Sequence, residues 1–284
     1  MGVRDQDALA YAALQGGLKS THKYVRATCP FCPYLVGKED RRMSLAFNMK
    51  TQWYRCWRCS TKGRVEKVPD YLLRLEVVEQ VSVETFDPPE EFVQFDGEEN
   101  PLLYGVPLAY LRSRGISDRI VHEAKIGACL RGFLAYRVVI PILARNGHTW
   151  LGYSARDWTN RSPLRYRYPK GMQRGKILFN SAALDADSQE PIIAVEGVFD
   201  ALPYWPHAVA FLGKPSHEQV DLLYETARPI VVVLDGDAHR EAWALATKLK
   251  LAGLRAAMVR LPPKSDPNDV DRRWLVNQAR EAIK

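Results

Sequence analysis

The chain has 284 residues, of which 46% are hydrophobic and 26% charged, and its formal net charge at pH 7 is +7. This length allows two or three domains at roughly 150 residues or fewer each. No apolar run approaches the ~18 residues that a membrane helix needs, and residues 1–6 lack a signal-peptide pattern. These features exclude membrane-spanning and secreted classes, so we expect a globular cytoplasmic protein, and the positive charge favours a polyanionic partner.

The charge is distributed unevenly along the chain. Residues 1–65 hold twelve basic and four acidic residues, residues 66–99 hold two and eleven, and residues 100–190 hold fourteen and six. Residues 191–284 are balanced at twelve of each sign. Two basic segments therefore flank an acidic one, which indicates nucleic acid or nucleotide contacts, although an ordinary solvated surface is the alternative.

Two cysteine pairs at the start of the chain predict a metal site. Cys29-Pro-Phe-Cys32 and Cys56-Trp-Arg-Cys59 are separated by twenty-three residues, and residues 43–48 and 52–55 between them suit short strands. A two-residue spacing lets each turn present both sulfurs to one ion, and two such turns complete the tetrahedral shell of structural Zn²⁺. Disulfides are the alternative, but a cytosolic chain disfavours them. Cys129 lacks a nearby second cysteine, and His22 is a less favoured zinc ligand than the four cysteines. The two cysteine pairs and the strands between them predict that residues 1–66 form a zinc β-ribbon domain.

Aromatic and basic residues alternate around the second cysteine pair. Trp53, Trp57 and Arg58 lie among further basic residues. Flat rings between cations suit unpaired nucleic acid bases, which stack on them with ~1–3 kcal/mol each. The alternative is that so small a domain needs its aromatic residues as core, but only every second residue of a strand can be buried.

The middle of the chain is predicted to contain a linker and a mixed domain. Residues 67–100 are acidic and include Pro88-Pro89, which is typical of a tether, with an ordered acidic face as the alternative. Residues 108–112 and 118–124 are predicted to be short helices separated by Arg114-Gly115, and residues 136–143 a strand. Residues 101–190 are therefore predicted to form a basic α+β domain.

The last part of the chain is predicted to be a doubly wound α/β domain, over residues 191–284. Apolar bursts separated by helical segments occur at residues 192–195, 208–212, 230–234 and 256–259, as expected for parallel strands covered on both faces. Acidic residues follow these bursts at Glu196, Asp200, Asp235 and Asp237, and further along at Asp266 and Asp269. Since ligands of open α/β sheets bind at the carboxyl ends of the strands, these acids are expected to converge and to need a cation between them. Hard oxygen donors favour Mg²⁺ or Mn²⁺.

These residues resemble the TOPRIM domain, which is shared by bacterial-type primases, topoisomerases and some nucleases. The motif Glu196-Gly-x-x-x-Asp200, followed by Asp235-Gly-Asp237, carries this resemblance. Among TOPRIM proteins, the zinc motif is most similar to that of the primases. The segments Arg137-Val-Val-Ile-Pro-Ile142 and Leu151-Gly-Tyr-Ser-Ala-Arg156 are similar to the basic subdomain of primases. In order and spacing, residues 24–271 are most similar to DnaG-type DNA primases.

The resemblance implies specific roles for individual residues. Zinc would be bound by Cys29, Cys32, Cys56 and Cys59. One or two catalytic Mg²⁺ or Mn²⁺ ions would be bound at Glu196, Asp235 and Asp237, with Asp200, Asp266 and Asp269 assisting and Lys176 catalytic. Nucleotide phosphates and template would contact Arg137, Arg156, Arg165 and Lys176. The implied reaction is the synthesis of short RNA primers on single-stranded DNA from ribonucleoside triphosphates in a bacterial or phage-infected cell.

The resemblance also implies partner proteins, and the sequence departs from the family pattern at two positions. No GxxxxGK[ST] loop occurs, so we expect a separate replicative helicase together with a single-strand-binding protein. Cys32 replaces a histidine usual in cellular members, which is similar to phage primases, and Asn268 stands where many relatives have Asp. The rival functions are a TOPRIM nuclease or topoisomerase, and a non-catalytic zinc-dependent DNA-binding module.

Overall fold

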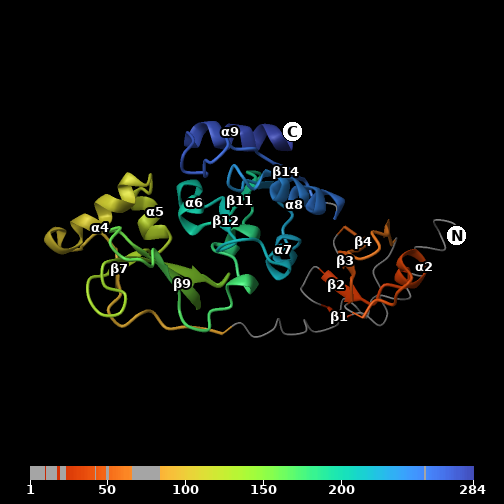
Figure 1. Cartoon of the computed structure of the whole chain (residues 1–284), viewed down its shortest axis with the longest axis horizontal. Coiled ribbons are helices and arrows are strands. Elements are labelled where there is room, and N and C mark those ends of the chain that lie inside the picture. The colour runs from red at the N-terminus through yellow and green to blue at the C-terminus, as the bar shows by residue number, and fades with distance from the viewer. Residues whose placement is uncertain are drawn as a thin grey trace. The chain divides into compact units, whose positions relative to one another are not determined.

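The computed structural model describes residues 10, 18–19, 24–41, 43–48, 51–65, 84–252 and 254–284. It divides into two compact units, Met1–Ser82 and Val83–Lys284 (Figure 1). Within the described residues no helix is both long and apolar enough to cross a membrane.

The first unit is built on one antiparallel sheet. Its strands lie in sequence order, and they are β1 (Leu18–Lys19), β2 (Tyr24–Ala27), β3 (Leu45–Asn48), β4 (Trp53–Cys56) and β5 (Lys62–Arg64). A short helix, α2 (Cys32–Val36), follows β2. The alternation of strand residues buries Val25, Phe47 and Tyr54 on one face of the sheet. The predicted β-ribbon is therefore confirmed, and the cysteine side chains belong to the same small core.

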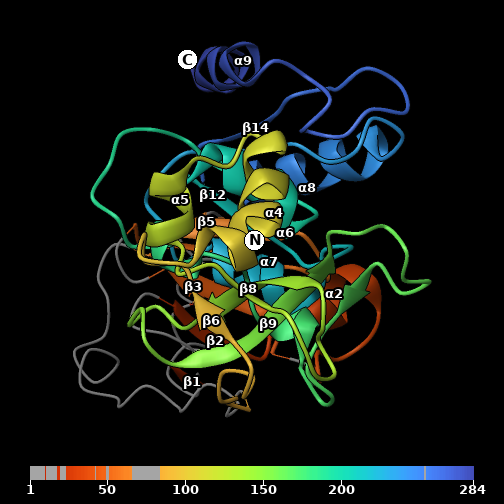
Figure 2. The same ribbon diagram turned by 90° about the vertical axis from the view of Figure 1, so that its left-hand side faces the viewer.

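The second unit begins with a second antiparallel sheet, which is ordered β10-β9-β8-β7-β6. Its strands are β6 (Val93–Gln94), β7 (Gly127–Cys129), β8 (Arg137–Leu143), β9 (Trp150–Asp157) and β10 (Tyr166–Arg167). Helices α4 (Pro101–Ser113) and α5 (Asp118–Glu123) lie together on one face of this sheet (Figures 1 and 2). Side-chain caps start both helices, since Asn100 accepts from Leu102 N and Ser117 accepts from Ile120 N.

The tether predicted for residues 67–100 is wrong for its second half. Strand β6 pairs with β7, Phe95 is fully buried, and the backbone N–H of Phe86 donates to Trp150 O at 2.9 Å. The acidic composition of this segment disfavours ordered packing, but aromatic contacts stabilise it. Phe92 packs edge-on against Trp150, and Phe95 packs edge-on against Tyr104. Residues 84–100 are thus an ordered acidic edge of the sheet, whereas residues 67–83 lie outside the described part of the chain.

The second unit ends in a four-stranded parallel sheet, ordered β12-β11-β13-β14. The strands are β11 (Ile192–Val195), β12 (Ala208–Ala210), β13 (Ile230–Val232) and β14 (Ala256–Met258), so all four predicted bursts are strands. The helices are α6 (Val198–Ala201), α7 (His217–Leu223), α8 (His239–Leu251) and α9 (Arg272–Ile283). Short 3₁₀ turns η1 (Arg174–Lys176), η2 (Ser181–Leu184) and η3 (Leu202–Tyr204) complete the unit.

The two sheets of the second unit share one apolar core. This core contains Leu111 and Ile140 from the antiparallel part together with Val195 and Val231 from the parallel sheet. An ion pair also crosses between the parts, because Arg145 contacts Glu225 at 2.6 Å and Asp185 at 3.0 Å. The segments predicted as separate domains, 101–190 and 191–284, therefore pack together as one compact unit.

Candidate functional site

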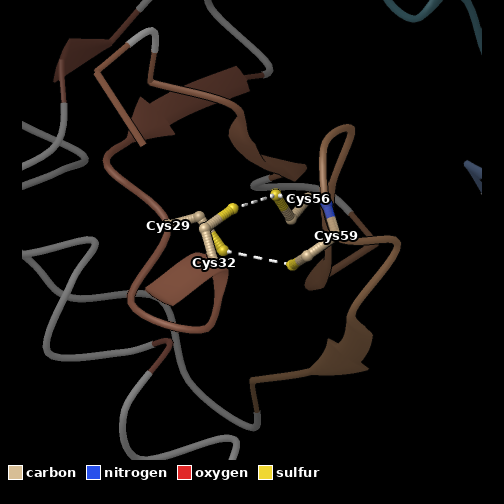
Figure 3. Close-up of side chains that lie close together, drawn as sticks. All are labelled: Cys29, Cys32, Cys56 and Cys59. Carbon is tan, nitrogen blue, oxygen red and sulfur yellow. Dashed lines mark hydrogen bonds between the residues drawn. The ribbon is translucent and has the colours of Figure 1, made fainter. Parts of the chain in front are cut away.

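The four cysteines converge in the first unit, as Figure 3 shows. Cys29 Sγ lies 3.6 Å from Cys59 Sγ, Cys32 Sγ lies 3.5 Å from Cys56 Sγ, and all four sulfurs are within 4.8 Å of one another. All are free thiols, so the disulfide alternative is not realised. A tetrahedral zinc shell with Zn–S bonds near 2.3 Å places sulfurs about 3.8 Å apart. The donor set and its spacing therefore fit one structural Zn²⁺.

The pKa values of these thiols depend on how closely the thiols lie together. A hydrogen bond with Cys29 lowers the pKa of Cys56 to about 5, and the same hydrogen bond raises the pKa of Cys29. Burial raises the pKa of Cys32 to about 12. Cys56 therefore ionises more readily than Cys29 or Cys32, because the negative charge of Cys56 opposes their ionisation. A divalent ion removes this penalty and lets the remaining thiols ionise.

One acid that the sequence did not single out holds this site in shape. Asp40 is 3% exposed and accepts from Cys29 N at 2.9 Å, Ser44 N at 2.6 Å and Ser44 Oγ at 2.8 Å. It thereby fixes the first cysteine turn against the start of β3. Backbone N–H groups of Arg58 and Cys59 point at Cys56 Sγ from 3.3 and 3.5 Å and add stabilisation for a thiolate there.

The exposed face of the first sheet is basic. Trp53 is 47% exposed while its neighbour Tyr54 is buried, so the alternation expected from the sequence is confirmed for these two residues. Arg64 pairs with Trp53 across β4 and β5, Lys62 pairs with Arg55, and the guanidinium of Arg55 lies 5.2 Å from the Trp57 ring. The predicted contact residue Arg58 instead directs its guanidinium to Glu39 O at 2.6 Å. His22 lies outside the described residues.

The predicted acidic residues lie where the strands of the parallel sheet end. Glu196 directly follows β11, and Asp235 and Asp237 follow β13. Burial, and next the charge of Asp235, raise the pKa of Glu196. Burial likewise raises the pKa of Asp235, together with the nearby charges of Asp266, Asp237 and Asp269. The charges of these carboxylates therefore act on one another at this edge of the parallel sheet.

These carboxylates do not form a closed cage. In the described part of the chain, the cysteines are the only group of three or more acidic, cysteine or histidine residues whose ligand atoms all lie within 4.8 Å of one another. Asp237 and Asp269 are exposed. Such an open arrangement suits Mg²⁺, which keeps several waters and takes few carboxylates, and it leaves coordination positions for phosphate oxygens.

Asp200 has different surroundings from the other acids. Its carboxylate accepts from Gly197 N at 3.1 Å and from Asn268 Nδ2 at 2.7 Å. Burial, and next the charge of Asp266, raise the pKa of Asp200 to about 7. Asn268, which stands where many TOPRIM sequences have an acid, therefore acts here as a hydrogen-bond donor to Asp200. The structure thus gives Asp200 the position of a brace for the Gly197 turn.

The loop after β14 joins the two acidic loops. Gly236 N donates to Ser265 O at 2.8 Å, and Tyr204 Oη donates to Pro267 O at 2.8 Å. A Cβ atom at Gly236 would lie 1.9 Å from Pro262 O, so only glycine fits between Asp235 and Asp237. This close approach fixes the backbone that carries both acids.

A separate polar cavity of about 350 Å³ lies in the antiparallel half. Its basic lining residues are Arg114, Arg156 and Arg165, and Asp157, Asn160, Ser162 and Pro163 complete it. Three arginines around one cavity suit a phosphate group. Arg156 and Arg165 are predicted contact residues, whereas Arg114 stands out in the sequence only as part of the Arg114-Gly115 break between the two helices.

Arg156 and Arg137 point to opposite faces of the sheet, because Arg137 pairs with Asp157 across β8 and β9. Arg156 donates to Tyr110 Oη and Tyr166 Oη, and its guanidinium lies 5.1 Å from the Phe199 ring. The side chain is therefore aimed at the parallel half, where the acids are.

Arg137 is 3% exposed and Arg156 is 4% exposed, so the two arginines differ in their partners and not in their burial. The guanidinium of Arg137 donates to Ser162 Oγ at 2.8 Å, Leu164 O at 2.8 Å and Arg165 O at 3.2 Å. Burial, and next the charge of Arg167, lower its pKa. In this structure Arg137 holds the loop that carries Arg165, and its donors are occupied by that loop.

Lys176 ends the η1 turn, which is tied to helix α7. Gln219 Nε2 donates to Arg174 O at 2.9 Å, and Ser216 Oγ donates to Gly175 O. Lys214 lies two residues before Ser216, and its positive charge acts to lower the pKa of Glu196. The larger effects of burial and of the charge of Asp235 outweigh it, so the pKa is raised overall. One cationic side chain, that of Lys214, thus lies close enough to the acidic edge to act on Glu196.

Comparisons with known proteins agree with this geometry. Residues 193–271 match a family model described as Toprim-like. No curated protein sequence matches the chain. Among solved structures, the zinc-binding and RNA polymerase domains of Aquifex aeolicus primase are 20% identical with a TM-score of 0.54, covering 100% of this chain and 85% of that one.

Two further structures each match about two thirds of the chain. The DnaG catalytic core is 22% identical with a TM-score of 0.50, covering 64% of this chain and 77% of that one. The RNA polymerase domain of Mycobacterium tuberculosis primase DnaG, in complex with double-stranded DNA, is 18% identical with a TM-score of 0.51. This match covers 66% of this chain and 74% of that one. The chain therefore carries a Toprim-like domain and has the fold of the zinc-binding and RNA polymerase domains of DnaG-type primases.

Proposed function

We propose that the protein is a DNA primase, a DNA-directed RNA polymerase that makes short RNA primers on single-stranded DNA from ribonucleoside triphosphates. The observation that carries this proposal is the pairing of an acidic sheet edge with an arginine-lined cavity inside one compact unit. Nucleotidyl transfer needs both parts, because divalent ions and fixed cations must stabilise the negative charge that builds up on the α-phosphate and the leaving pyrophosphate.

The metal chemistry is assigned to Glu196, Asp235 and Asp237. Mg²⁺ or Mn²⁺ bound there would lower the pKa of the attacking 3′-hydroxyl and screen the charge of the transition state. Asp266 and Asp269 raise the local negative potential that retains the ions, and Asp200 braces the Gly197 turn next to Glu196. Arg114, Arg156, Arg165 and Lys176 are proposed to bind the phosphates of the incoming nucleotide.

The template is assigned to the basic face of the first unit, around Trp53 and Trp57. Zinc at the four cysteines would keep this sheet folded, and the exposed Trp53 ring between Arg64 and Arg55 provides a stacking surface for an unpaired base. Cations on the same face attract the DNA backbone without regard to sequence. A separate helicase and a single-strand-binding protein are proposed as partners in replication.

The experiment that tests the proposal is primer synthesis from labelled ribonucleotides on single-stranded DNA with Mg²⁺. Short RNA is expected from the wild-type chain and from Asp187→Ala, which removes an exposed acid that is not part of the acidic loops. Asp235→Ala should make no RNA yet bind DNA as well as the wild type. Loss of both activities together would contradict the proposed division of labour, and cleaved DNA without RNA would favour the nuclease instead.

A further inference from the structure

Gln219 is a fully buried polar side chain in the first turn of helix α7. It forms a capping box with Ser216, because Gln219 N donates to Ser216 Oγ at 3.1 Å and Ser216 N donates to Gln219 Oε1 at 3.0 Å. A glutamate at this position would cap the helix equally well, since only the side-chain oxygen is used. The amide nitrogen of Gln219 is therefore not needed to start α7.

This amide nitrogen, Nε2, binds backbone outside the helix. It donates to Arg174 O at 2.9 Å, to Ile177 O at 2.7 Å and to Phe211 O at 2.5 Å. The amide has two hydrogens, so the three carbonyl oxygens share them. The hydrogen bond from Ser216 N fixes the oxygen end of the amide, so the nitrogen end must face these carbonyls. One side chain therefore ties two further segments to α7.

Two of the three carbonyls lie on either side of Lys176. Arg174 O belongs to the η1 turn, and Ile177 O follows the turn directly. In the part of the chain that the structure describes, no hydrogen bond or ion pair involves Lys176 Nζ. The position of this ammonium group therefore depends on the backbone of η1, which Gln219 holds both before and after Lys176.

The third carbonyl connects the same side chain to the acidic edge. Phe211 follows β12, and its N–H donates to Val195 O at 3.0 Å, at the end of β11. Two residues further on, Gly213 N donates to Glu196 O at 3.1 Å. The backbone that Gln219 binds at Phe211 thus runs alongside Glu196. One amide group therefore links the turn that carries Lys176 to the strand end that carries Glu196.

We propose that Gln219 is a positioning residue, which fixes Lys176 relative to Glu196 so that the cation and the metal-binding carboxylate act on the same phosphate chain. The inference deepens the proposed function and rests on it, because Lys176 and Glu196 receive their roles there. A long, flexible cationic side chain binds its ligand more tightly when the backbone beneath it is held in place. Because Gln219 is fully buried, it supports Lys176 without itself contacting the substrate.

The fold is expected to persist when this amide is removed. The backbone after η1 has its own anchor, because Phe179 N donates to Ala210 O at 3.0 Å and Ala210 N donates to Phe179 O at 3.3 Å. On η1 itself, Arg174 keeps a second contact, since its guanidinium lies 4.5 Å from the Tyr168 ring. Lys176 has no such contact with a described residue, so loss of the amide should displace Lys176 more than its neighbours.

The test measures the binding of inorganic tripolyphosphate to the full chain with Mg²⁺, by calorimetric titration of Gln219→Met, Lys176→Ala and the double variant. We expect each single change to weaken binding about fivefold and the double variant to bind like Lys176→Ala, because a residue that acts through another adds no separate loss. The matched control is Thr226→Val, which removes another buried donor, since Thr226 Oγ1 donates to Leu184 O at 2.7 Å. Thr226 precedes β13, whereas Asp235 follows it. Thr226→Val should lower the stability in urea and leave the affinity unchanged.

The outcomes separate this inference from the function on which it rests. Additive losses in the double variant, wild-type affinity in either single variant, an equal loss in Thr226→Val, or no tripolyphosphate binding by the wild type would each overturn the positioning role. If the wild type makes primers but the losses are additive, the positioning role fails and the primase stands. If the losses are not additive and no RNA is made, the positioning role stands and the primase fails. In a chain that makes primers, Gln219→Met should raise the KM for ATP and Thr226→Val should not, and the reverse would overturn the positioning role.

Discussion

Arg137 offers the sharpest test of how the arginine-lined cavity is built. The resemblance implies that it contacts nucleotide or template, but the structure buries it and directs its guanidinium to three acceptors of the loop at residues 162–165. We expect Arg137→Met to act mainly on stability, with phosphate binding reduced only because Arg165 is no longer held in place.

The magnitude follows from the contacts. Hydrogen bonds from a charged donor are worth ~1.5–3 kcal/mol each, and removing a buried cation leaves its partners unsatisfied, so a loss of about 3–5 kcal/mol in the free energy of unfolding is expected. Arg165→Ala removes an exposed side chain instead and should change stability by less than about 0.5 kcal/mol while weakening phosphate binding.

Urea denaturation followed by tryptophan fluorescence measures the stability of both variants, and titration with tripolyphosphate measures anion binding. The reasoning is refuted if Arg137→Met unfolds at the wild-type urea concentration and yet loses anion affinity as Arg165→Ala does. That pattern would make Arg137 a direct phosphate contact.

Three further outcomes are expected. Chelation of zinc, or Cys32→Ser, should remove one equivalent of metal and unfold the first unit while the Val83–Lys284 unit keeps its cooperative transition, which circular dichroism with metal analysis can check. Asn268→Ala should destabilise the protein by about 1–3 kcal/mol in thermal melts, because Asp200 loses its side-chain donor. Since burial raises the pKa of Asp200 to about 7, the folded metal-free protein holds this proton more tightly than the unfolded chain does. Stability should therefore fall as the pH rises from about 4 to about 7, level off above that, and recover with Mg²⁺ more at pH 8 than at pH 5.

The sequence predicts the elements whose signals are local. The cysteine pairs predict the sulfur cluster because ligand spacing is itself a local feature, and the four apolar bursts predict the parallel strands because both faces of such a sheet are covered. The placement of Glu196 and Asp235 at one sheet edge follows from the same rule, since the neighbouring parallel strands β11 and β13 end at that edge.

Features that depend on pairing across the fold could not be predicted in this way. Arg137 and Arg156 look equivalent as bases on neighbouring strands, and only the register, which pairs Arg137 with Asp157, sends them to opposite faces. The roles of Asp40 and Asn268 rest on hydrogen bonds to residues eleven and sixty-eight positions away. The acids and prolines of residues 84–100 predict a tether, because the partners of Phe92 and Phe95, Trp150 and Tyr104, lie elsewhere in the sequence.

The central claim is that Glu196, Asp235 and Asp237 bind divalent ions together. The most direct measurement is the anomalous X-ray signal of crystals soaked in Mn²⁺, which locates the ion independently of any activity. The account predicts manganese at the carboxyl ends of β11 and β13, about 2.0–2.4 Å from carboxylate oxygens of these residues. Manganese found only elsewhere, or no ordered ion at this edge, would contradict it.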